Sequence, residues 1–306
     1  MAFRVLASDP LDASAVAAMR AAGLVVDEKT DLTPEQLQAE IASYDAIVVR
    51  SATKVRAPVI DAAKNLKLIV RAGVGLDNVD AEYAAKKGIA VRNTPAASSN
   101  SVAELALGHM LSLARSIGRA TASMKAGKWE KKQLSGIEIE GKTLGIIGIG
   151  RIGQLLAAKA HALGMSVVCY DAYLKTSPIP SVARMVSLDE LLAVSDFISL
   201  HIPFDPSVGA VLGAKEIRKM KSGVRIVNCA RGGVVDEAAL AEGLRTGKVA
   251  GAALDVFAAE PPAPDHPLFA LDPVSLTPHI GAATDEAQAR VGDEAARIVI
   301  EFARTR

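Results

Sequence analysis

The chain has 306 residues, of which 50% are hydrophobic and only 4% aromatic, a length and balance that suit two domains of buried parallel strands and covering helices. The 35 basic and 34 acidic residues leave a formal net charge of +1. The chain therefore has no overall positive electrostatic field that would attract nucleic acid or an anionic membrane, and any anion must be recognised by local groups. The N-terminus has no signal-peptide pattern, and no apolar run approaches about 18 residues, the length of a membrane-spanning helix. The two cysteines, Cys169 and Cys229, lie in apolar strand-like segments. These features predict a cytoplasmic protein with buried thiols.

The first hundred residues alternate strand-like and helix-like segments, an order typical of a parallel sheet covered by helices. We expect strands at 3–8, 24–26, 46–50, 67–71 and 89–91, and helices at 12–22, 34–41, near 58 and at 81–87. The segment RAGVGLDNVD, residues 71–80, contains Gly73 and Gly75 but lacks the third glycine of a dinucleotide motif. We therefore interpret it as a backbone loop beside a substrate.

A small, polar segment that contains a proline, NTPAASSN at 93–100, indicates a crossing between domains. Ser101 and Glu104 follow with the spacing of a capping box, which predicts a long helix that begins there and runs to Gly127. The lysines at 128, 131 and 132, taken alone, are expected to lie on a solvated surface.

Residues 141–171, GKTLGIIGIGRIGQLLAAKAHALGMSVVCYD, form the most informative stretch of the chain. An apolar strand leads into Gly148, Gly150 and Gly153, a helix follows, and a second strand ends on Asp171. In a dinucleotide site the glycines serve the tight turn, the approach of the pyrophosphate and close helix packing, while the acid binds the ribose hydroxyls and repels a 2′-phosphate. The pattern predicts NAD binding, and a glycine-rich turn without a ligand is the alternative.

Strands and helices continue to alternate as far as Ile280. We expect strands at 197–203, 225–231, 249–257 and 274–279, and helices at 188–193, 214–220 and 236–244. Ligands bind at the carboxyl ends of strands in doubly wound sheets, and four polar residues lie at such ends: His201, Arg231, Asp255 and His279. Because packing does not require polar groups there, this convergence favours an enzyme.

The last segment, 284–306, has the apolar stripe of one amphipathic helix. A second crossing near Gly281 would let this helix return to the first domain. We therefore predict an α/β protein with two doubly wound, Rossmann-like domains that have parallel sheets. The substrate-binding domain would be discontinuous, with residues 1–99 and 283–306, and the NAD-binding domain would comprise residues 100–282.

Hydride transfer from a secondary alcohol requires a base for the hydroxyl proton, and an acid substrate requires a cation to hold it. His279 suits the first task because it lies at a strand end and imidazole is the usual acid or base near neutral pH. Glu260 could orient its ring, and Arg231 could supply a bidentate cation, with Gly232 and Gly233 leaving room for close approach. A structural ion pair is the alternative for Arg231 or Glu260, and no His or Cys spacing predicts a metal site.

The motifs GIGRIG, VNCARGGVVDE, GAALDVFAAEPP and TPHIGAAT occur in this order, and together they resemble the D-2-hydroxyacid dehydrogenase family. Within it, RSATKV, RAGVGLDNVD, NTP, SVAEL and ATASMKAGKWE are most similar to the D-3-phosphoglycerate dehydrogenase branch. The resemblance extends from about Val48 to the C-terminal helix. It implies NAD as cofactor, a cleft between two domains that closes on binding, and a homodimer formed mainly through the NAD-binding domains.

The resemblance also implies the roles of individual residues. His279 would be the acid and base, Glu260 its partner, and Arg231 the group that orients the substrate. The residues that would bind the cofactor are Val74, Gly148, Gly150, Arg151, Ile152, Gly153, Asp171, Ile202, Cys229, Ala230, Asp255, Gly281 and Ala282. Those that would bind the substrate or its phosphate are Arg50, Arg71, Val74, Gly75 and Lys131, the last of which stands where a close relative has arginine.

The expected reaction is the NAD-dependent interconversion of 3-phosphoglycerate and 3-phosphohydroxypyruvate, a step of serine biosynthesis. A glyoxylate or hydroxypyruvate reductase is the alternative within the family. An NAD-sensing protein-binding module, similar to the related corepressors, is the alternative of another class. The sequence ends soon after its last helix, without the C-terminal regulatory domains of longer phosphoglycerate dehydrogenases, so no serine feedback through such a domain is expected.

Overall fold

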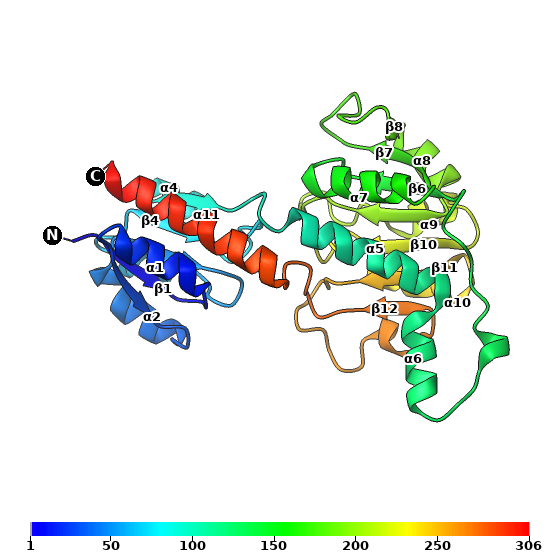
Figure 1. Ribbon diagram of the computed structural model, residues 1–306, viewed down its shortest axis with the longest axis horizontal. Helices are drawn as coiled ribbons and strands as arrows, with labels where there is room; N and C mark the ends of the chain where they lie inside the picture. The colour runs from blue at the N-terminus through cyan, green and yellow to red at the C-terminus, as the bar shows by residue number, and fades with distance from the viewer. Residues whose placement is uncertain (1, 306) are drawn as a thin grey trace. The chain divides into compact units, whose positions relative to one another are not determined.

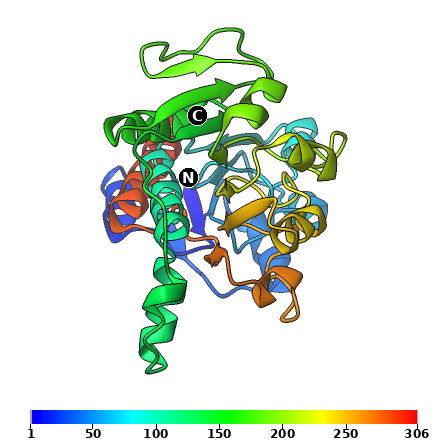
Figure 2. The ribbon, with the colours of Figure 1, turned by 90° about the vertical axis from the view of Figure 1, so that its right-hand side faces the viewer.

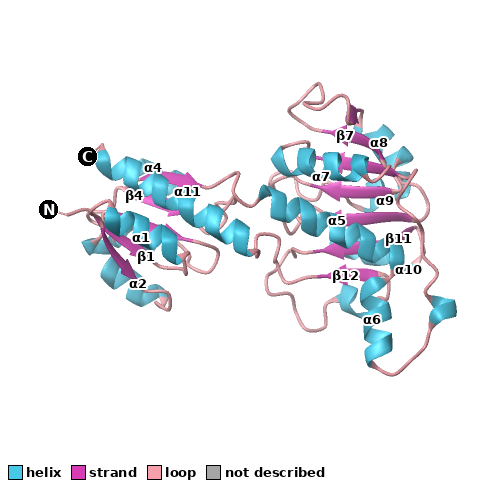
Figure 3. Cartoon of the chain, in the orientation of Figure 1, coloured by secondary structure: helices cyan, strands magenta, loops and turns pink. Residues whose placement is uncertain are grey.

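The computed structural model describes residues 2–305, and contacts between Cα atoms divide the chain into two compact units. Unit 1 comprises the residues up to Ser99 and those from Ala282 onward, and unit 2 comprises Asn100–Gly281. Each unit has one sheet of parallel strands with helices packed on it (Figure 1, Figure 3). The predicted class, α/β with two doubly wound parallel sheets, is confirmed. No helix within residues 2–305 has the length and apolar character needed to span a bilayer.

Unit 1 is built on a five-stranded sheet with the order β2-β1-β3-β4-β5. Its central strand, β3, reads AIVV and is buried along its whole length, because a central parallel strand is covered on both faces. The strands are β1 (Arg4–Ala7), β2 (Val25–Glu28), β3 (Ala46–Val49), β4 (Leu68–Arg71) and β5 (Ala90–Asn93). Helices α1 (Ala13–Ala21) and α11 (Asp285–Arg304) cover one face, and α2 (Pro34–Glu40), α3 (Ala57–Ala62) and α4 (Ala81–Lys86) cover the other.

Helix α11 brings the end of the chain back to unit 1 (Figure 1). The Thr284 side chain caps its first turn by accepting from the N–H of Ala287. Val291, Ala295 and Val299 are buried on the stripe that the sequence predicts. Gly292 lets α11 approach α1 closely, since a Cβ there would lie 3.1 Å from the Cβ of Ala15.

Unit 2 is built on a seven-stranded sheet with the order β12-β11-β10-β9-β6-β7-β8. Helices α5 and α7 pack on one face, and α8, α9 and α10 pack on the other. The strands are β6 (Thr143–Ile147), β7 (Ser166–Tyr170), β8 (Ala183–Met185), β9 (Phe197–Leu200), β10 (Val224–Asn228), β11 (Val249–Leu254) and β12 (Val274–Leu276). The helices are α5 (Ser99–Arg115), α6 (Ile117–Lys125), α7 (Arg151–Ala162), α8 (Leu188–Val194), α9 (Ala214–Lys219) and α10 (Glu237–Arg245). Short 3₁₀ turns lie at Lys131–Gln133 and Pro267–Ala270 in this unit and at Ile41–Ser43 in unit 1.

Two predictions about the helix after the crossing are wrong. The helix begins at Ser99, not after Ser101, so Ser101 lies inside α5 and its hydroxyl donates to Gly281 O at 2.7 Å. The helix also does not run unbroken to Gly127, because Ser116 adopts a left-handed conformation (φ 52°) and separates α5 from α6. Helix α6 consequently turns away from α5 and extends beyond the sheet of unit 2 (Figure 2).

The edge strand β8 was not predicted. It has three residues, ARM, and pairs only with β7. A segment of this length carries no detectable period of two, so its pairing depends on the strand beside it.

Candidate active site

The glycine-rich turn after β6 has space for a ligand at one glycine and none at the other two. Gly148 has φ +95°, and a Cβ there would lie 2.5 Å from His201 O. A Cβ at Gly153 would lie 2.3 Å from Gly148 O, so the start of α7 packs directly on the turn. At Gly150, the N-cap of α7, a Cβ would have no neighbour within 4 Å. The turn therefore leaves open space beside the free N–H groups of a helix start, which fits a pyrophosphate.

Asp171 follows β7 and lies beside this turn. Its Oδ2 accepts from Ile149 N–H at 3.1 Å, and its Oδ1 accepts from the N–H groups of Tyr173 and Leu174. These contacts hold the carboxylate next to the turn. The position is compatible with a ribose ligand, whose hydroxyls could use the lone pairs that remain.

Other predicted cofactor residues lie at the ends of β9 and β10 and at the start of α7. Ile202 follows β9, and its Cγ2 lies 2.7 Å from the position that a Cβ on Gly148 would take. Arg151 and Ile152 form the first turn of α7, the former exposed and the latter half-buried. Cys229 is buried just after β10, and burial raises the pKa of its thiol, so the thiol is neutral and apolar in character.

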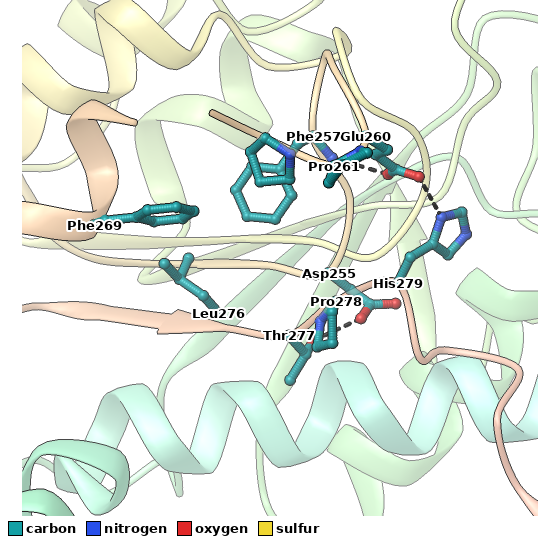
Figure 4. Close-up of a pocket in the computed structure, with 10 residues that line it drawn as sticks. Asp255, Phe257, Glu260, Pro261, Phe269, Leu276, Thr277, Pro278 and His279 are labelled. Atoms are coloured by element: carbon teal, nitrogen blue, oxygen red, sulfur yellow. Dashed lines mark hydrogen bonds and ion pairs between the residues drawn. The ribbon is translucent and has the colours of Figure 1, made fainter. Parts of the chain in front are cut away.

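Glu260 and His279, predicted to be partners, lie in contact. His279 Nδ1 and Glu260 Oε2 are 2.7 Å apart, and Oε1 of the same carboxylate accepts from Phe257 N–H at 3.1 Å (Figure 4). Because Nδ1 faces the carboxylate, Nε2 is the nitrogen that can exchange a proton with a substrate. A cavity of about 430 Å³ adjoins the pair, and Phe257, Phe269 and Leu276 give it an apolar wall.

The backbone at His279 is in the left-handed region, with φ 54°. For a residue other than glycine this conformation costs on the order of 1–2 kcal/mol. It is held by Asp255, whose carbonyl oxygen accepts from His279 N–H at 2.8 Å and whose carboxylate accepts from Ile280 N–H and Gly281 N–H, each at 2.8 Å. Asp255 is 1% exposed, so it fixes the segment that carries His279, and its predicted place beside the nicotinamide remains a prediction.

A chain of hydrogen bonds links this segment to α5 and was missed by sequence reasoning. Thr277 donates its hydroxyl proton to Asp255 Oδ1 at 2.6 Å, so His109 Nε2, at 3.1 Å, donates to Thr277. His109 Nδ1 lies 2.9 Å from Ser275 Oγ. Burial lowers the pKa of His109 and keeps its ring neutral. In sequence, His109 is simply one polar position on an apolar helix, and no local signal indicates its partners.

Arg231 is positioned by the turn after β10. The buried Asn228 donates to Arg231 O at 2.9 Å and accepts from Ala230 N–H at 3.1 Å, and Arg231 Nη1 donates to Ala230 O at 2.7 Å. The prediction that Gly232 leaves room for a ligand is wrong. A Cβ at Gly232 would lie 1.8 Å from Phe257 O, so this glycine makes room for the loop that carries Glu260.

His201 lies at a strand end, as predicted, but not in a position to exchange protons. Its Nε2 lies 2.9 Å from Ser199 Oγ, and its Nδ1 is shielded from solvent without a partner. Burial lowers the pKa of His201 to about 4, so the ring is neutral near pH 7. Of the four polar strand ends, Asp255 and His279 contact each other, Arg231 is held by its own turn, and His201 packs with its carbonyl oxygen against Gly148.

Unit 1 brings Arg50 and Arg71 to the carboxyl ends of neighbouring strands, since Val49 of β3 pairs with Arg71 of β4. The loop after β3 is fixed by two buried polar residues that sequence reasoning did not single out. Asp9 accepts from the N–H groups of Arg50 and Thr53, and Asn78 donates to their carbonyl oxygens.

The residues predicted to bind the substrate lie in both units, with Val74 and Gly75 in unit 1 and Lys131 in unit 2. Val74 and Gly75 are half-buried, and Val74 O accepts from Asn93 Nδ2 at 2.6 Å. The Arg71 guanidinium lies over Gly73, where a Cβ would be 1.5 Å from Nη1. Ala282 belongs to unit 1, and its carbonyl oxygen accepts from Gln288. Lys131 is exposed on the 3₁₀ turn of unit 2.

Across residues 2–305, no group of His, Cys, Asp and Glu side chains has the arrangement of a metal site.

The family whose sequence model matches the chain is described as D-isomer specific 2-hydroxyacid dehydrogenase, NAD binding domain, and the match covers residues 107–281. A hydroxypyruvate reductase of Thermotoga maritima is 51% identical over 299 residues, which is 95% of each chain. A D-3-phosphoglycerate dehydrogenase of Archaeoglobus fulgidus is 48% identical over 302 residues, 98% of this chain, and the chain spans only 57% of the length of that relative.

A solved structure of D-lactate dehydrogenase from Aquifex aeolicus, complexed with NAD and lactic acid, has a TM-score of 0.85 and 32% identity and covers 99% of this chain and 96% of its own. The family resemblance and the expected cofactor, NAD, are confirmed. The chain therefore belongs to the D-isomer specific 2-hydroxyacid dehydrogenase family, and its unit 2 contains the NAD-binding domain of that family.

Proposed function

We propose that the chain catalyses the reversible NAD-dependent oxidation of 3-phosphoglycerate to 3-phosphohydroxypyruvate. The single observation that supports an oxidation of a 2-hydroxy acid is the 2.7 Å contact between His279 Nδ1 and Glu260 Oε2 within the unit that carries the NAD-binding domain. The phosphate of the substrate is proposed from Arg50 and Arg71, at adjacent strand ends of unit 1. The relatives that bear this enzyme's name support the same substrate.

The proton of the reaction is assigned to His279 Nε2. In the oxidation, the C2 hydroxyl of the substrate gives its proton to this nitrogen while the C2 hydrogen leaves with its electron pair and C–O becomes C=O. Glu260 holds the ring through Nδ1 and balances the positive charge that the ring gains. In the reverse direction His279 returns the proton to the new hydroxyl oxygen. Bound NAD supplies the acceptor for the hydride, and NADH supplies the donor.

Binding of the two ligands is assigned to separate groups of residues. Arg231 would orient the substrate carboxylate and keto oxygen through its planar donors, and the backbone N–H groups of Val74 and Gly75 would bind the carboxylate. For the cofactor, the turn around Gly150 would hold the pyrophosphate and Asp171 the ribose. Replacing Arg50 by glutamine tests the phosphate assignment. We expect KM to rise at least tenfold for phosphohydroxypyruvate and less than twofold for hydroxypyruvate, and an equal rise for both would contradict the assignment.

A hydroxypyruvate or glyoxylate reductase is the second candidate. It is favoured by the relative that matches this chain over 95% of both lengths. A panel of 2-keto acids assayed with NADH separates the candidates. If phosphohydroxypyruvate is not reduced while hydroxypyruvate or glyoxylate is reduced well, the second candidate replaces the first.

An NAD-sensing protein-binding module remains the candidate of another class. It predicts tight NADH binding without turnover. Steady-state assays of the wild type, Arg231→Ala and His279→Ala decide between the classes. We expect the substitutions to lower kcat/KM by at least about a hundredfold while NADH binding persists. Equal and negligible turnover in all three proteins, across all 2-keto acids, would exclude the enzyme.

We also propose that the chain forms a homodimer through unit 2. Its proposed location is the reducing cytoplasm, and its proposed pathway is serine biosynthesis. The dimer is supported by large apolar side chains exposed on or near α6: Ile117 at 51%, Met124 at 56% and Trp129 at 79%. We expect the double substitution Met124→Glu and Trp129→Glu to produce a monomer in sedimentation velocity. Tyr173→Glu, at a 91% exposed aromatic residue elsewhere on unit 2, is the control and should leave the dimer intact.

A further inference from the structure

A second cavity of unit 2 lies at the amino ends of its strands, opposite the end that carries His279. It has a volume of about 170 Å³ and is bordered by the first residues of β10, β11 and β12, by the junction between α5 and α6, and by residues 135–136. This volume corresponds to roughly five or six water molecules. The site can therefore hold a small ion and not a dinucleotide.

The walls of the cavity are fixed by backbone packing. A Cβ at Gly136 would lie 2.4 Å from Ala114 O, so segment 135–137 lies directly against the end of α5. Ile137 N–H donates to Ala114 O at 2.9 Å and fastens the same contact. The left-handed Ser116 ends α5 at this point and directs the first turn of α6, with Arg119, along the cavity.

Arg225, on β10, is the charged group at the inner end. Its guanidinium stacks over the Phe197 ring at 5.6 Å, and Nη1 makes one long hydrogen bond to Gly223 O at 3.3 Å. Nε is shielded from solvent and has no hydrogen-bond partner, and among the described residues no carboxylate forms an ion pair with this side chain. Burial lowers the pKa of Arg225, yet arginine stays charged near pH 7. A half-buried cation whose Nε is shielded from solvent without a partner favours a counter-charge beside it.

The acids near the cavity supply it only in part, since burial lowers the pKa of Arg225 and the charge of Asp196 acts to raise it without forming an ion pair with the side chain. Asp196 is engaged by Lys221 at 3.1 Å and by Thr143 N–H at 2.8 Å. Asp272, on the rim, is 78% exposed and lies 3.8 Å from Arg119, a distance at which an exposed pair contributes little. Two arginines and one exposed carboxylate leave the cavity with a net positive charge, and three serine hydroxyls, of Ser112, Ser116 and Ser135, add donors around it.

We propose that this cavity binds a small oxyanion of the phosphate type, held by Arg225 and Arg119 and by the serine hydroxyls between them. Arginine pairs with such anions through parallel N–H groups, and the hydroxyls can donate to the remaining oxygens. The site is distinct from the dinucleotide turn and from the phosphate residues proposed in unit 1. Its occupancy does not depend on the identity of the substrate.

The test is a calorimetric titration of the whole chain with inorganic phosphate at constant ionic strength, with saturating NADH to fill the pyrophosphate site. We expect Arg225→Gln to lose at least tenfold in affinity at one phosphate site and Arg119→Gln to lose severalfold. Arg184→Gln, which removes the same charge from an exposed ion pair of unit 2, is the matched control and should bind as the wild type does. Identical affinity and stoichiometry in the wild type and Arg225→Gln would overturn the proposal.

Two further measurements test the site if Arg225→Gln does not fold or if it changes the oligomeric state. If Arg225→Gln no longer binds NADH and so does not fold, crystals of the wild type soaked in selenate replace the titration. An anomalous selenium peak between Arg119 and Arg225 would support the site, and ordered water alone at that position would overturn it. A change of oligomeric state in Arg225→Gln without any phosphate binding by the wild type would also overturn it, because the counter-charge would then come from a second copy of the chain.

Discussion

Replacing Glu260 by glutamine tests the proton transfer most directly. The amide keeps the size of the side chain, and its oxygen can still accept from Phe257 N–H, which is 3.1 Å from Oε1 in the wild type. It then places an N–H group where a carboxylate oxygen lies 2.7 Å from His279 Nδ1. This donor favours a proton on Nε2, the atom that must accept the substrate proton during oxidation.

The magnitude follows from the exposure of the pair. A hydrogen bond to a charged group contributes about 1.5–3 kcal/mol, and side-chain exposures of 47% for His279 and 37% for Glu260 place this one at the lower end because solvent screens it. We therefore expect kcat/KM to fall about tenfold, by the same factor in both directions, because the equilibrium constant of the reaction does not change.

The assay is the absorbance of NADH with the 2-keto acid that the wild type reduces best. A fluorescence titration should show unchanged NADH binding. Glu237→Gln is a matched control, since Glu237 Oε2 lies 2.9 Å from His266 Nε2 in another histidine–carboxylate pair of unit 2. It should stay within about threefold of the wild type. If Glu260→Gln keeps kcat/KM within twofold of the wild type, Glu260 does not act through His279.

Three other changes have expected outcomes. Asp171→Ala should weaken NAD binding and relax the discrimination against NADP, because the carboxylate that repels a 2′-phosphate is gone; an unchanged ratio of the two dissociation constants would exclude Asp171 as the ribose ligand. Thr277→Val should lower the free energy of unfolding by about 1–3 kcal/mol, because His109 and Asp255 each lose a buried partner; urea titration measures it, and a loss below about 0.5 kcal/mol would contradict the argument. Stability should fall as pH drops from 6.5 to about 4, because His201 gains a proton in the unfolded chain and not in the fold; His201→Gln should remove up to about 3 kcal/mol of this dependence, and an identical pH profile would refute the assignment.

The parts of the fold that the sequence predicts are those whose cause is local. The glycine turn, the helix after it and Asp171 follow one another in the chain, so their spacing alone indicates how they meet. The apolar stripe of α11 likewise predicts which residues are buried. The break at Ser116 could not be predicted in this way, because the sequence on both sides is compatible with a helix and the division occurs where segment 135–137 packs on the end of α5.

The sequence indicates Glu260 as a candidate partner of His279 with a structural ion pair as the alternative, and the family resemblance makes this assignment specific, although the two residues are 19 positions apart on different segments. The residues that hold the site residues in place were not predicted from the sequence. Asn228, which holds the turn of Arg231, and Thr277, which holds Asp255, are polar residues whose partners lie on other strands or later turns. The pair of Thr277 and Asp255 depends on strand register, which a single sequence does not encode in a readable form, whereas the contacts of Asn228 are local and depend on the conformation of the turn.

The buried Asp255 explains why these supporting residues matter for the chemistry. A carboxylate that is 1% exposed is costly unless donors surround it, and here it accepts from two backbone N–H groups and one hydroxyl. All three donors belong to the segment 277–281, and His279, in its left-handed conformation, lies at the centre of that segment. The free energy of satisfying Asp255 thus offsets the cost of the conformation that turns His279 toward Glu260. His279, the base of the proposed oxidation and the acid of the reverse reaction, is therefore positioned by the fold before any substrate binds.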